Sequence, residues 1–367
     1  MYQSKEDREA LEVIACLDER LSLEEIDVGG KRKKIIRKGY YGYLFGIERF
    51  VKDIEARWKG AFVEQTTRYS KIKKIRELYL GKTYYRFVNI WLERYSDLYR
   101  YSARVEVFYD ACKKLRLLSP DPFYLAEPGD ICGADGMRYM DLFNALIDEV
   151  HERCQSREFK ERERLRLENA DRNATKVLTF GDAMFEAKSR WLVLDLTLSY
   201  QAKFRRWITV EQVQRHRKRF FVARRFNELM SGIRSYVWGM EQDEKGGLHL
   251  HVILFYSSES NHDEFIAQQI CEYWDSVVTE GKGEAWNSNR AWLKRRYRMH
   301  GHGVGIGQID RTDTEKREAL RKNLLYLAKA EQYLLSRSTE RIRTFDMGRV
   351  PRKVKAGRPR NQGMLAT

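Results

Sequence analysis

The sequence predicts an α+β protein: a mainly helical N-terminal region, then a C-terminal, ferredoxin-like antiparallel sheet with helices packed against one face. Two observations lead to this prediction. Residues 1–117 contain no proline and repeat apolar residues at spacings of three and four, which is typical of amphipathic helices. From about residue 176 the order becomes strand, helix, hairpin, helix, strand, helix, which is the order of a ferredoxin-like layout.

The chain length of 367 residues indicates two or three domains. The proline- and glycine-rich stretch from Ser119 to Gly136 is the clearest loop in the first half. Composition and periodicity together divide the chain into five segments. These are a helical basic and aromatic region (1–117), a loop (118–136), a charged helical linker (137–175), the sheet domain (176–340) and a basic tail (341–367).

The charge of the chain points to a polyanionic partner. A net charge of +16 favours nucleic acid, while a generally basic protein is the alternative. Basic residues are interleaved with tyrosines at 31–43 and 71–86, a mixture that can bind phosphates and stack on bases. The same residues would equally form solvated helix faces with tyrosines in the core, so both interpretations stay open.

Cysteine usage and hydropathy indicate the compartment. The five cysteines are widely spaced and form no C-x-x-C pair, which is typical of a reducing cytosol. The N-terminus has no apolar signal core, and no apolar run approaches the length of a membrane span. We therefore expect a soluble, cytoplasmic protein without a membrane partner.

Alternation patterns define the elements of the C-terminal domain, beginning with a strand at Trp191–Ser199. The elements that follow are a basic helix (Glu211–Met230), a hairpin (Tyr236–Phe255), a helix capped by Asn261 (His262–Thr279), an irregular basic stretch (Gly281–Arg298), a glycine-bearing strand (His302–Ile309) and a long helix (Asp313–Leu335).

The hairpin carries a candidate metal site. His249 and His251 alternate with leucines in its second strand and point to one face, which suits chelation of a divalent cation. If the turn has an odd number of residues, Glu241 in the first strand shares that face. Two imidazoles and a carboxylate would then leave coordination positions open for a substrate oxygen. Alternatively, the two histidines are packing residues.

The long last helix carries a candidate nucleophile. Tyr326, Lys329 and Tyr333 lie at i, i+3 and i+7, roughly opposite the helix's leucine stripe. A phenol is a weak nucleophile unless it is assisted, and a nearby ammonium would favour the phenolate or neutralise a phosphate. The leucine stripe consists of Leu320, Leu324, Leu327 and Leu334.

These residues resemble the active site of the HUH superfamily of single-strand nicking enzymes. The match consists of His249-Leu-His251, two histidines around one hydrophobic residue, followed by Tyr326-Leu-Ala-Lys329. Within the superfamily, residues 191–351 are similar to the inovirus-type replication initiation proteins, a filamentous-phage-like family also found in prophages. The similar segments are 192–200, 236–241, 246–254 and 325–334.

The resemblance implies a HUH endonuclease-like fold and a role in rolling-circle replication. His249 and His251 would bind Mg or Mn, and Tyr326 would attack DNA, leaving a 5′-phosphotyrosine link and a 3′-hydroxyl. Lys329 would assist the tyrosine or position the phosphate. The third ligand varies within the superfamily, and Glu241 is the candidate here.

Further partners and residues follow from the same resemblance. The 3′-hydroxyl would prime a host polymerase, and a host helicase would unwind the duplex, because the chain shows no motor motif. The DNA partners would be the duplex origin and its single strand. Tyr333 is either a second nucleophile or a structural residue.

Three other sequence features are weaker. His300-Gly-His302 is also His-x-His, but its glycines favour a flexible loop over a chelate. Gly301–Gly307 lacks the Gly-Lys-Ser/Thr ending of a phosphate-binding loop. In the tail, Gly357-Arg358-Pro-Arg360 resembles the core of an AT-hook, so Arg358 and Arg360 are candidate DNA-binding residues; a disordered basic tail that binds phosphates is the alternative.

Three other functions remain open from the sequence. A transposase or a plasmid relaxase would use the same chemistry. A prophage regulator would bind DNA without catalysis. A structural zinc site would explain the histidines in a third way, and it predicts that chelation unfolds the protein.

Overall fold

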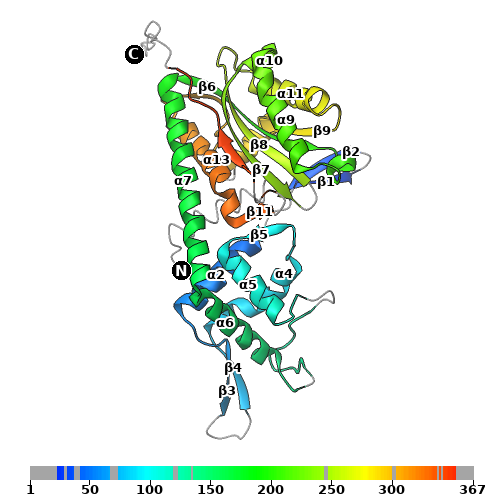
Figure 1. The fold of residues 1–367 in the computed structure, drawn as a ribbon, viewed down its shortest axis with the longest axis vertical. Coiled ribbons are helices and arrows are strands. Elements are labelled where there is room, and N and C mark those ends of the chain that lie inside the picture. The colour runs from blue at the N-terminus through cyan, green and yellow to red at the C-terminus, as the bar shows by residue number, and fades with distance from the viewer. Residues whose placement is uncertain are drawn as a thin grey trace. The chain divides into compact units, whose positions relative to one another are not determined.

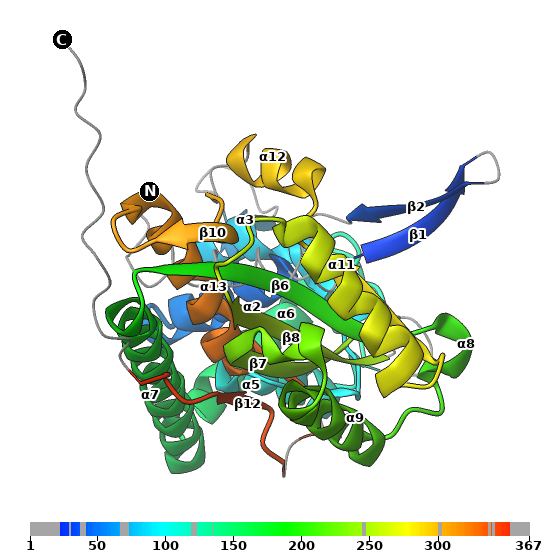
Figure 2. The same cartoon turned by 90° about the horizontal axis from the view of Figure 1, so that it is seen from above.

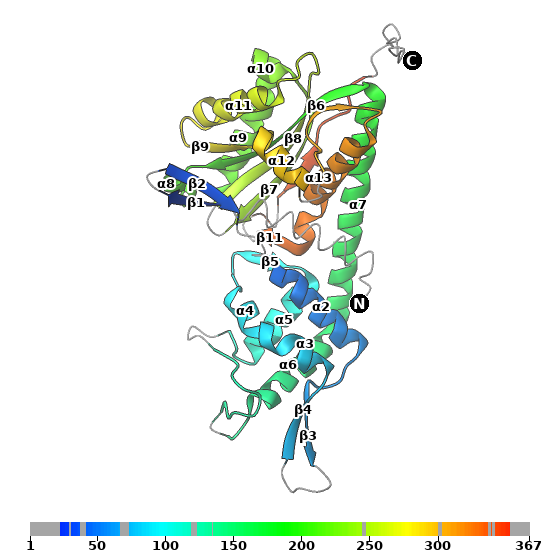
Figure 3. The ribbon, with the colours of Figure 1, turned by 180° about the vertical axis from the view of Figure 1, so that it is seen from behind.

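The computed structural model describes residues 23–28, 31–36, 42–66, 73–118, 123–133, 135–243, 247–299, 303–336, 339 and 342–352. The chain forms two compact units. The N-terminal unit is Met1–Arg172 with Lys329–Glu340, and the sheet unit is Asn173–Ala328 with Arg341–Thr367. Figures 1 and 3 show the ribbon from opposite sides. The α+β class is confirmed, because helices are combined with antiparallel sheets.

Aromatic packing holds the helices of the N-terminal unit together. The ring of Phe50 lies 5.1 to 6.1 Å, centroid to centroid, from the rings of Tyr84, Trp91, Phe108 and Phe143. Such pairs add about 0.5–1.5 kcal/mol each beyond the apolar area that they bury. The helices are α2 (Gly42–Ala56), α3 (Tyr79–Tyr84), η1 (Tyr85–Phe87), α4 (Val88–Glu93), α5 (Ala103–Lys114), α6 (Tyr139–Gln155) and the first half of α7 (Arg157–Ala187).

The N-terminal unit also contains strands that the expectation of a mainly helical region did not include. They pair as β1 (Leu23–Val28) with β2 (Lys31–Ile36), β3 (Phe62–Thr66) with β4 (Lys73–Glu77), and β5 (Tyr99–Tyr101) with β11 (Leu334–Ser336). Val28 pairs with Lys31 across the dipeptide Gly29-Gly30. A Gly-Gly dipeptide between two strands is a hairpin signal, and it identifies the basic run at 31–36 as a strand.

Two helices run from one unit into the other. Helix α7 has 31 residues and ends at Ala187, beyond the end expected near residue 170. Helix α13 (Thr314–Tyr333) stops two residues before the expected Leu335, because the chain continues there as β11 and pairs with β5. In the sheet unit, Gly181 of α7 allows α13 to approach closely: a Cβ at this position would lie 2.8 Å from Cδ1 of Leu324.

The sheet unit is built on a six-stranded sheet in which every pair is antiparallel. Its strand order is β10-β6-β8-β7-β12, as Figure 2 shows, and β9 pairs with β6 beyond the end of β10. The strands are β6 (Arg190–Tyr200), β7 (Ile233–Asp243), β8 (Gly247–Tyr256), β9 (Gly283–Asn287), β10 (Gly307–Asp310) and β12 (Phe345–Met347).

Helices cover both faces of this sheet, whereas one covered face was expected. Even-numbered residues of β6 and β8 pack against α9 (Val210–Val222), α11 (Asp263–Tyr273) and the π-helical turn η3 (Trp274–Val278). On the opposite face, Phe255 contacts Phe180 of α7, with ring centroids 5.7 Å apart, and α13 lies beside it (Figure 1). Both sides of β6 and β8 carry apolar residues, so both need cover from water.

Several boundaries differ from the sequence prediction. The helix expected at 211–230 breaks after Val222 into η2 (Ala223–Arg225) and α10 (Glu228–Ser231), where the side chain of Asn227 accepts a hydrogen bond from Met230 N. Helix α11 is preceded by His262, without a side-chain cap from Asn261. The stretch expected to be irregular contains β9 and the helix α12 (Ala291–Met299).

Among the residues that the structure describes, no helix is both long enough and apolar enough to cross a membrane.

Candidate active site

The hairpin of β7 and β8 places Glu241 directly opposite His249, and Gly239 directly opposite His251. The last pair before the turn is Asp243 with Gly247, so the turn has three residues; those residues, 244–246, lie outside the described part of the chain. An odd turn was the condition for placing the glutamate and the histidines on one face, and this register meets it.

Glu241 and His249 form the first acid–imidazole pair of the site. Nδ1 of His249 lies 3.1 Å from the carbonyl oxygen of Gly247, which can only accept, so Nδ1 donates. This tautomer leaves Nε2 as an acceptor, 3.6 Å from Oε2 of Glu241. At metal–ligand distances of about 2.1 Å, two ligand atoms lie roughly 3 to 3.5 Å apart, so this spacing is close to that of two ligands of one cation.

His251 and Asp195 form the second pair. Nε2 of His251 lies 2.7 Å from Oδ1 of Asp195 in the neighbouring strand β6, and both side chains are buried. The carboxylate accepts the Nε2 proton, which makes Nδ1 the acceptor nitrogen of the ring. A carboxylate that holds one imidazole nitrogen is the usual way in which a metal-binding histidine is oriented.

Asp195 is a residue of this cluster that the sequence analysis does not name. The sequence nevertheless distinguishes Asp195, because it is the one acidic residue in the otherwise apolar run Leu192–Leu196. Because β6 pairs with β8 in the register Thr197 to His251, Asp195 lies diagonally across from His251 on the same face.

Tyr326 of α13 reaches this cluster. Its phenolic oxygen lies 3.1 Å from Oε1 and 3.2 Å from Oε2 of Glu241, so the hydroxyl donates to the carboxylate. Its ring centroid lies 6.0 Å from that of His251. The side chain is 1% exposed, and Leu324 and Leu327 beside it are equally buried. Tyr326 is therefore buried although it lies roughly opposite the leucine stripe of its helix, because α13 is covered on both sides at this point.

The absence of a side chain at Gly239 lets α13 approach the sheet here. A Cβ on this residue would lie 3.3 Å from Cδ2 of Leu327 and 3.9 Å from Oε1 of Glu241. The glycine therefore occupies the place on β7 over which the helix with the tyrosine passes.

The other predicted residues are not brought into this cluster by the contacts seen. Nζ of Lys329 lies 3.6 Å from Oδ1 of Asp171, and both residues belong to the N-terminal unit. Tyr333 is the last residue of α13, but its side chain lies outside the described part of the structure, as do His300, His302, Arg358 and Arg360.

The four polar groups on the sheet fit a divalent cation by their chemistry, since two imidazoles and two carboxylates are common ligands of Mn²⁺ and related ions. As they stand, they form two separate pairs. Within the described residues, no group of three or more histidine, cysteine, aspartate and glutamate side chains is arranged to hold a metal ion.

Comparison with known proteins gives no match: no family model, no curated protein and no solved structure is similar to this chain. Its function has to be argued from the residues of the site.

Proposed function

We propose that this chain is a metal-dependent enzyme that cuts and rejoins single-stranded DNA through a 5′-phosphotyrosine link, and that it initiates rolling-circle replication. The observation that carries the proposal is the hydrogen bond from Tyr326 to Glu241, which stands directly opposite His249. A phenol, a carboxylate and two histidines from segments far apart in the sequence meet in one place. Packing alone does not require this combination of groups.

The topology of the sheet unit supports the proposal. Its elements follow one another as β6, α9, β7, β8, α11 and β9, with the neighbour order β9-β6-β8-β7. This succession agrees with the β-α-β-β-α-β order expected of a ferredoxin-like unit and so supports the proposal. HUH nicking enzymes, which the sequence resembles, carry their paired histidines on a central strand of such a sheet, and β8 is a central strand here.

The proposed reaction is an in-line displacement at phosphorus. The oxygen of Tyr326 forms a bond to the scissile phosphorus, and the bond from phosphorus to the 3′-oxygen breaks. Glu241 takes the phenolic proton that it already accepts in a hydrogen bond, and the 3′-oxygen leaves as a hydroxyl after gaining a proton from solvent. The phosphotyrosine keeps the bond energy, so attack by a 3′-hydroxyl reverses the step and joins the ends.

A bound Mg or Mn ion would supply charge stabilisation to the phosphate and the leaving oxygen. His249 and Glu241 are the residues spaced to hold it, and the Nδ1 atom of His251 would be available as a further donor. Asp195 orients the His251 ring by accepting its Nε2 proton.

A basic and aromatic segment beside the hairpin is a suitable path for the DNA strand. Helix α8 (Ala202–Arg205) follows β6, and a Cβ on Gly247 would lie 3.4 Å from Cβ of Arg205. Trp207 is 77% exposed, and Lys203 and Arg206 are exposed beside it. An exposed indole among cations is the usual platform for a single-stranded base.

The burial of Tyr326 requires an opening step before DNA can reach it. Separation of α13 from β7 at Gly239, where Leu327 packs over the glycine, is a movement that would expose the phenol. We expect DNA binding to favour the open form.

A covalent-adduct assay tests the proposal. The protein is incubated with 5′- and 3′-labelled single-stranded DNA and MnCl₂ or MgCl₂, and the products are separated on a denaturing gel. Wild type and Tyr273→Phe, a control on α11, should give a protease-sensitive adduct, and Tyr326→Phe should give none. An adduct with Tyr326→Phe would contradict the assigned nucleophile.

The other functions predict different results. A transposase or a relaxase would form the same adduct with a different DNA. A replication assay on a circular origin template distinguishes a replication initiator from these two enzymes, because only the initiator leads to copying of the template after nicking. A regulator gives binding without an adduct. A structural zinc site gives unfolding when the metal is chelated.

A further inference from the structure

Within the part of the chain that the structure describes, β3 and β4 of the N-terminal unit pair only with each other and form a two-stranded ribbon. Beyond Phe62, which is the one buried residue of β3, the hairpin projects away from the helices of the unit (Figure 3). Every residue of β4 is exposed. An isolated hairpin is at best marginally stable in water, so this one needs anchoring at its base.

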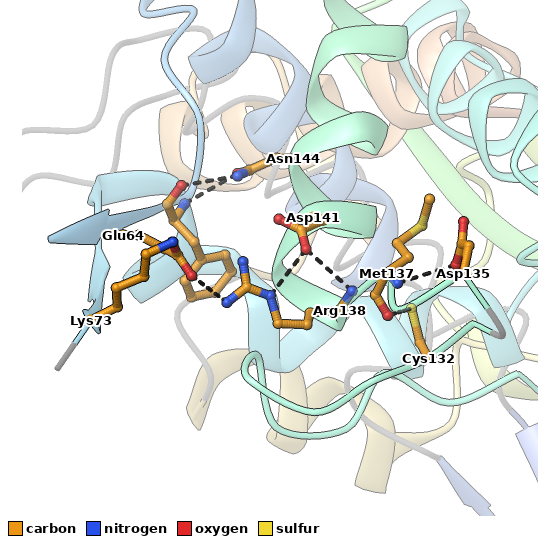
Figure 4. A network of polar contacts seen from close by, with 9 residues as sticks. Glu64, Lys73, Cys132, Asp135, Met137, Arg138, Asp141 and Asn144 are labelled. Carbon is orange, nitrogen blue, oxygen red and sulfur yellow. Dashed lines mark hydrogen bonds and ion pairs between the residues drawn. The ribbon is translucent and has the colours of Figure 1, made fainter. Parts of the chain in front are cut away.

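The anchor is a set of polar contacts with α6, shown in Figure 4. Asn144 accepts hydrogen bonds from Ala61 N and Phe62 N at 2.7 and 3.1 Å, and it donates to Phe62 O at 2.9 Å. Arg138 at the start of α6 reaches Glu64 at 2.5 Å, and Lys73 on the neighbouring strand pairs with the same carboxylate at 2.8 Å.

These contacts define two different faces of the ribbon. Glu64 pairs with Ile75 and Thr66 pairs with Lys73, so these residues share one face of the ribbon. This face carries the ion pairs, and the contact of Glu64 with Arg138 turns it toward the rest of the unit. A Cβ on Gly129 would lie 3.1 Å from Cδ1 of Ile75, which places this loop against the same face. Hydrogen bonds from Lys73 and Arg138 lower the pKa of Glu64, so its carboxylate is charged and is already paired with these two cations.

The opposite face, which we name the open face, consists of Val63, Gln65, Lys74 and Arg76. All four are exposed, with Val63 at 38%. In the described part of the structure, the amide of Gln65, the ammonium of Lys74 and the guanidinium of Arg76 have no hydrogen-bond or ion-pair partner. The same hairpin therefore carries its described ion pairs on one face and leaves the polar groups of the other face to solvent.

We propose that the open face enters the major groove of duplex DNA and reads base edges, and so selects the site at which the chain acts. A two-stranded ribbon has the width that the major groove admits. Glutamine pairs with adenine, and arginine or lysine pairs with guanine, through hydrogen bonds to their groove edges. Two uncompensated cations on this face complement the phosphates on either side. The inference rests on the proposed function only for the choice of DNA as the ligand.

The test uses the full-length protein and a library of duplexes with 20 random base pairs. Bound duplexes are recovered and sequenced, and affinity for the enriched duplex is measured by fluorescence anisotropy at fixed salt. Arg76→Gln and Lys74→Gln each remove one charge from the open face. Lys73→Gln removes the same charge from the opposite face of the same hairpin and is the matched control.

We expect Arg76→Gln and Lys74→Gln to weaken binding by roughly ten-fold to a hundred-fold and to relax the base preference at one or two positions. Lys73→Gln should leave the preference intact and weaken binding by a few-fold at most. Equal losses for all three variants would overturn base reading in favour of general electrostatic attraction. Absence of enrichment, or an unchanged preference in Arg76→Gln and Lys74→Gln, would overturn the proposal outright.

The same variants separate this inference from the nicking activity. On single-stranded DNA, all three should form the covalent adduct at the wild-type rate, because the hairpin lies outside the sheet unit. If wild type enriches a sequence but forms no adduct, the nicking function fails and the ribbon proposal stands. If wild type forms the adduct but enriches no sequence, the ribbon proposal fails and the nicking function stands.

Discussion

The phenolic oxygen of Tyr326 lies within hydrogen-bond distance of both carboxylate oxygens of Glu241, at 3.1 and 3.2 Å. The two residues are 85 positions apart in the chain. Sheet register fixes the glutamate opposite His249, and close packing of α13 over Gly239 brings the tyrosine to it. The proposed chemistry depends on this contact, because it gives the phenolic proton an acceptor next to the metal ligands.

Glu241→Gln should slow adduct formation by about 10²–10⁴-fold, since the amide keeps the shape of the carboxylate but cannot take the proton. The first-order rate of adduct formation under single-turnover conditions measures this. Glu228→Gln on α10 is the control, because it removes an exposed carboxylate from the same unit. A Glu241→Gln rate within three-fold of wild type would remove the base from the mechanism.

Asp195→Asn should weaken Mn²⁺ binding by roughly 10–100-fold, because the amide no longer fixes the tautomer and orientation of the His251 ring. Electron paramagnetic resonance of free Mn²⁺ measures the affinity without DNA and without turnover. The control is Asp346→Asn on β12, because Asp346 is in an exposed ion pair with Arg343.

The Asp195 carboxylate is itself held in place through its backbone. Oδ1 of Asn289 accepts from Asp195 N at 2.9 Å, and Nδ2 of Asn289 donates to Val193 O at 3.0 Å. Asn289→Ala should therefore weaken Mn²⁺ binding in the same direction as Asp195→Asn, although it touches no ligand. Unchanged Mn²⁺ affinity in Asp195→Asn would show that the Asp195–His251 pair has a packing role alone.

Gly239→Val should lift α13 from the sheet and slow adduct formation, while Gly239→Ala should be tolerated. A Cβ here would be tight only against the flexible end of Leu327, at 3.3 Å, and in ordinary contact with Glu241, but the two γ-carbons of valine overpack the site, at a cost of about 1–3 kcal/mol. Thermal unfolding and adduct rates measure both effects. Leu327→Ala in the Gly239→Val background should restore part of the rate; equal rates for all three glycine-site variants would contradict the role assigned to this contact.

Trp207→Ala should weaken binding of single-stranded DNA by about 1–3 kcal/mol, the usual value of one base stacked on an aromatic ring. Anisotropy titration of a labelled oligothymidine measures this. Phe226→Ala is the control: it is 72% exposed, but it follows the far end of α9, a helix about 20 Å long. Equal losses for both variants, or none for Trp207→Ala, would exclude this residue from the DNA path.

The sequence was sufficient to predict the β7–β8 hairpin and the face that carries Glu241, His249 and His251. Side chains alternate with a period of two, so the parity of Glu241, His249 and His251 decided their common face once the turn was odd. The helical period of the apolar residues likewise predicted the helix α13, which carries Tyr326. It did not predict how deeply Tyr326 is buried.

Contacts between strands that are distant in sequence could not be predicted. The ferredoxin-like order implies that β6 lies beside β8, but the register that brings Asp195 diagonally across from His251 is encoded in no local pattern. The ion pair of Lys329 with Asp171 likewise joins residues of the N-terminal unit that are far apart in the sequence. The β3–β4 hairpin was read as part of a helical region, because its basic residues carry no strand-like apolar alternation and its stability comes from the anchor on α6.

Peptide mapping of the DNA adduct tests the central claim most directly. After nuclease and trypsin treatment, cleavage at Lys322, Lys329 and Arg337 places Tyr326 and Tyr333 on different peptides, 323–329 and 330–337. The account predicts a nucleotide phosphate on Tyr326 in the first peptide. A modification found only on Tyr333 or on another residue, or no covalent adduct from wild-type protein with Mg²⁺ or Mn²⁺, would contradict it.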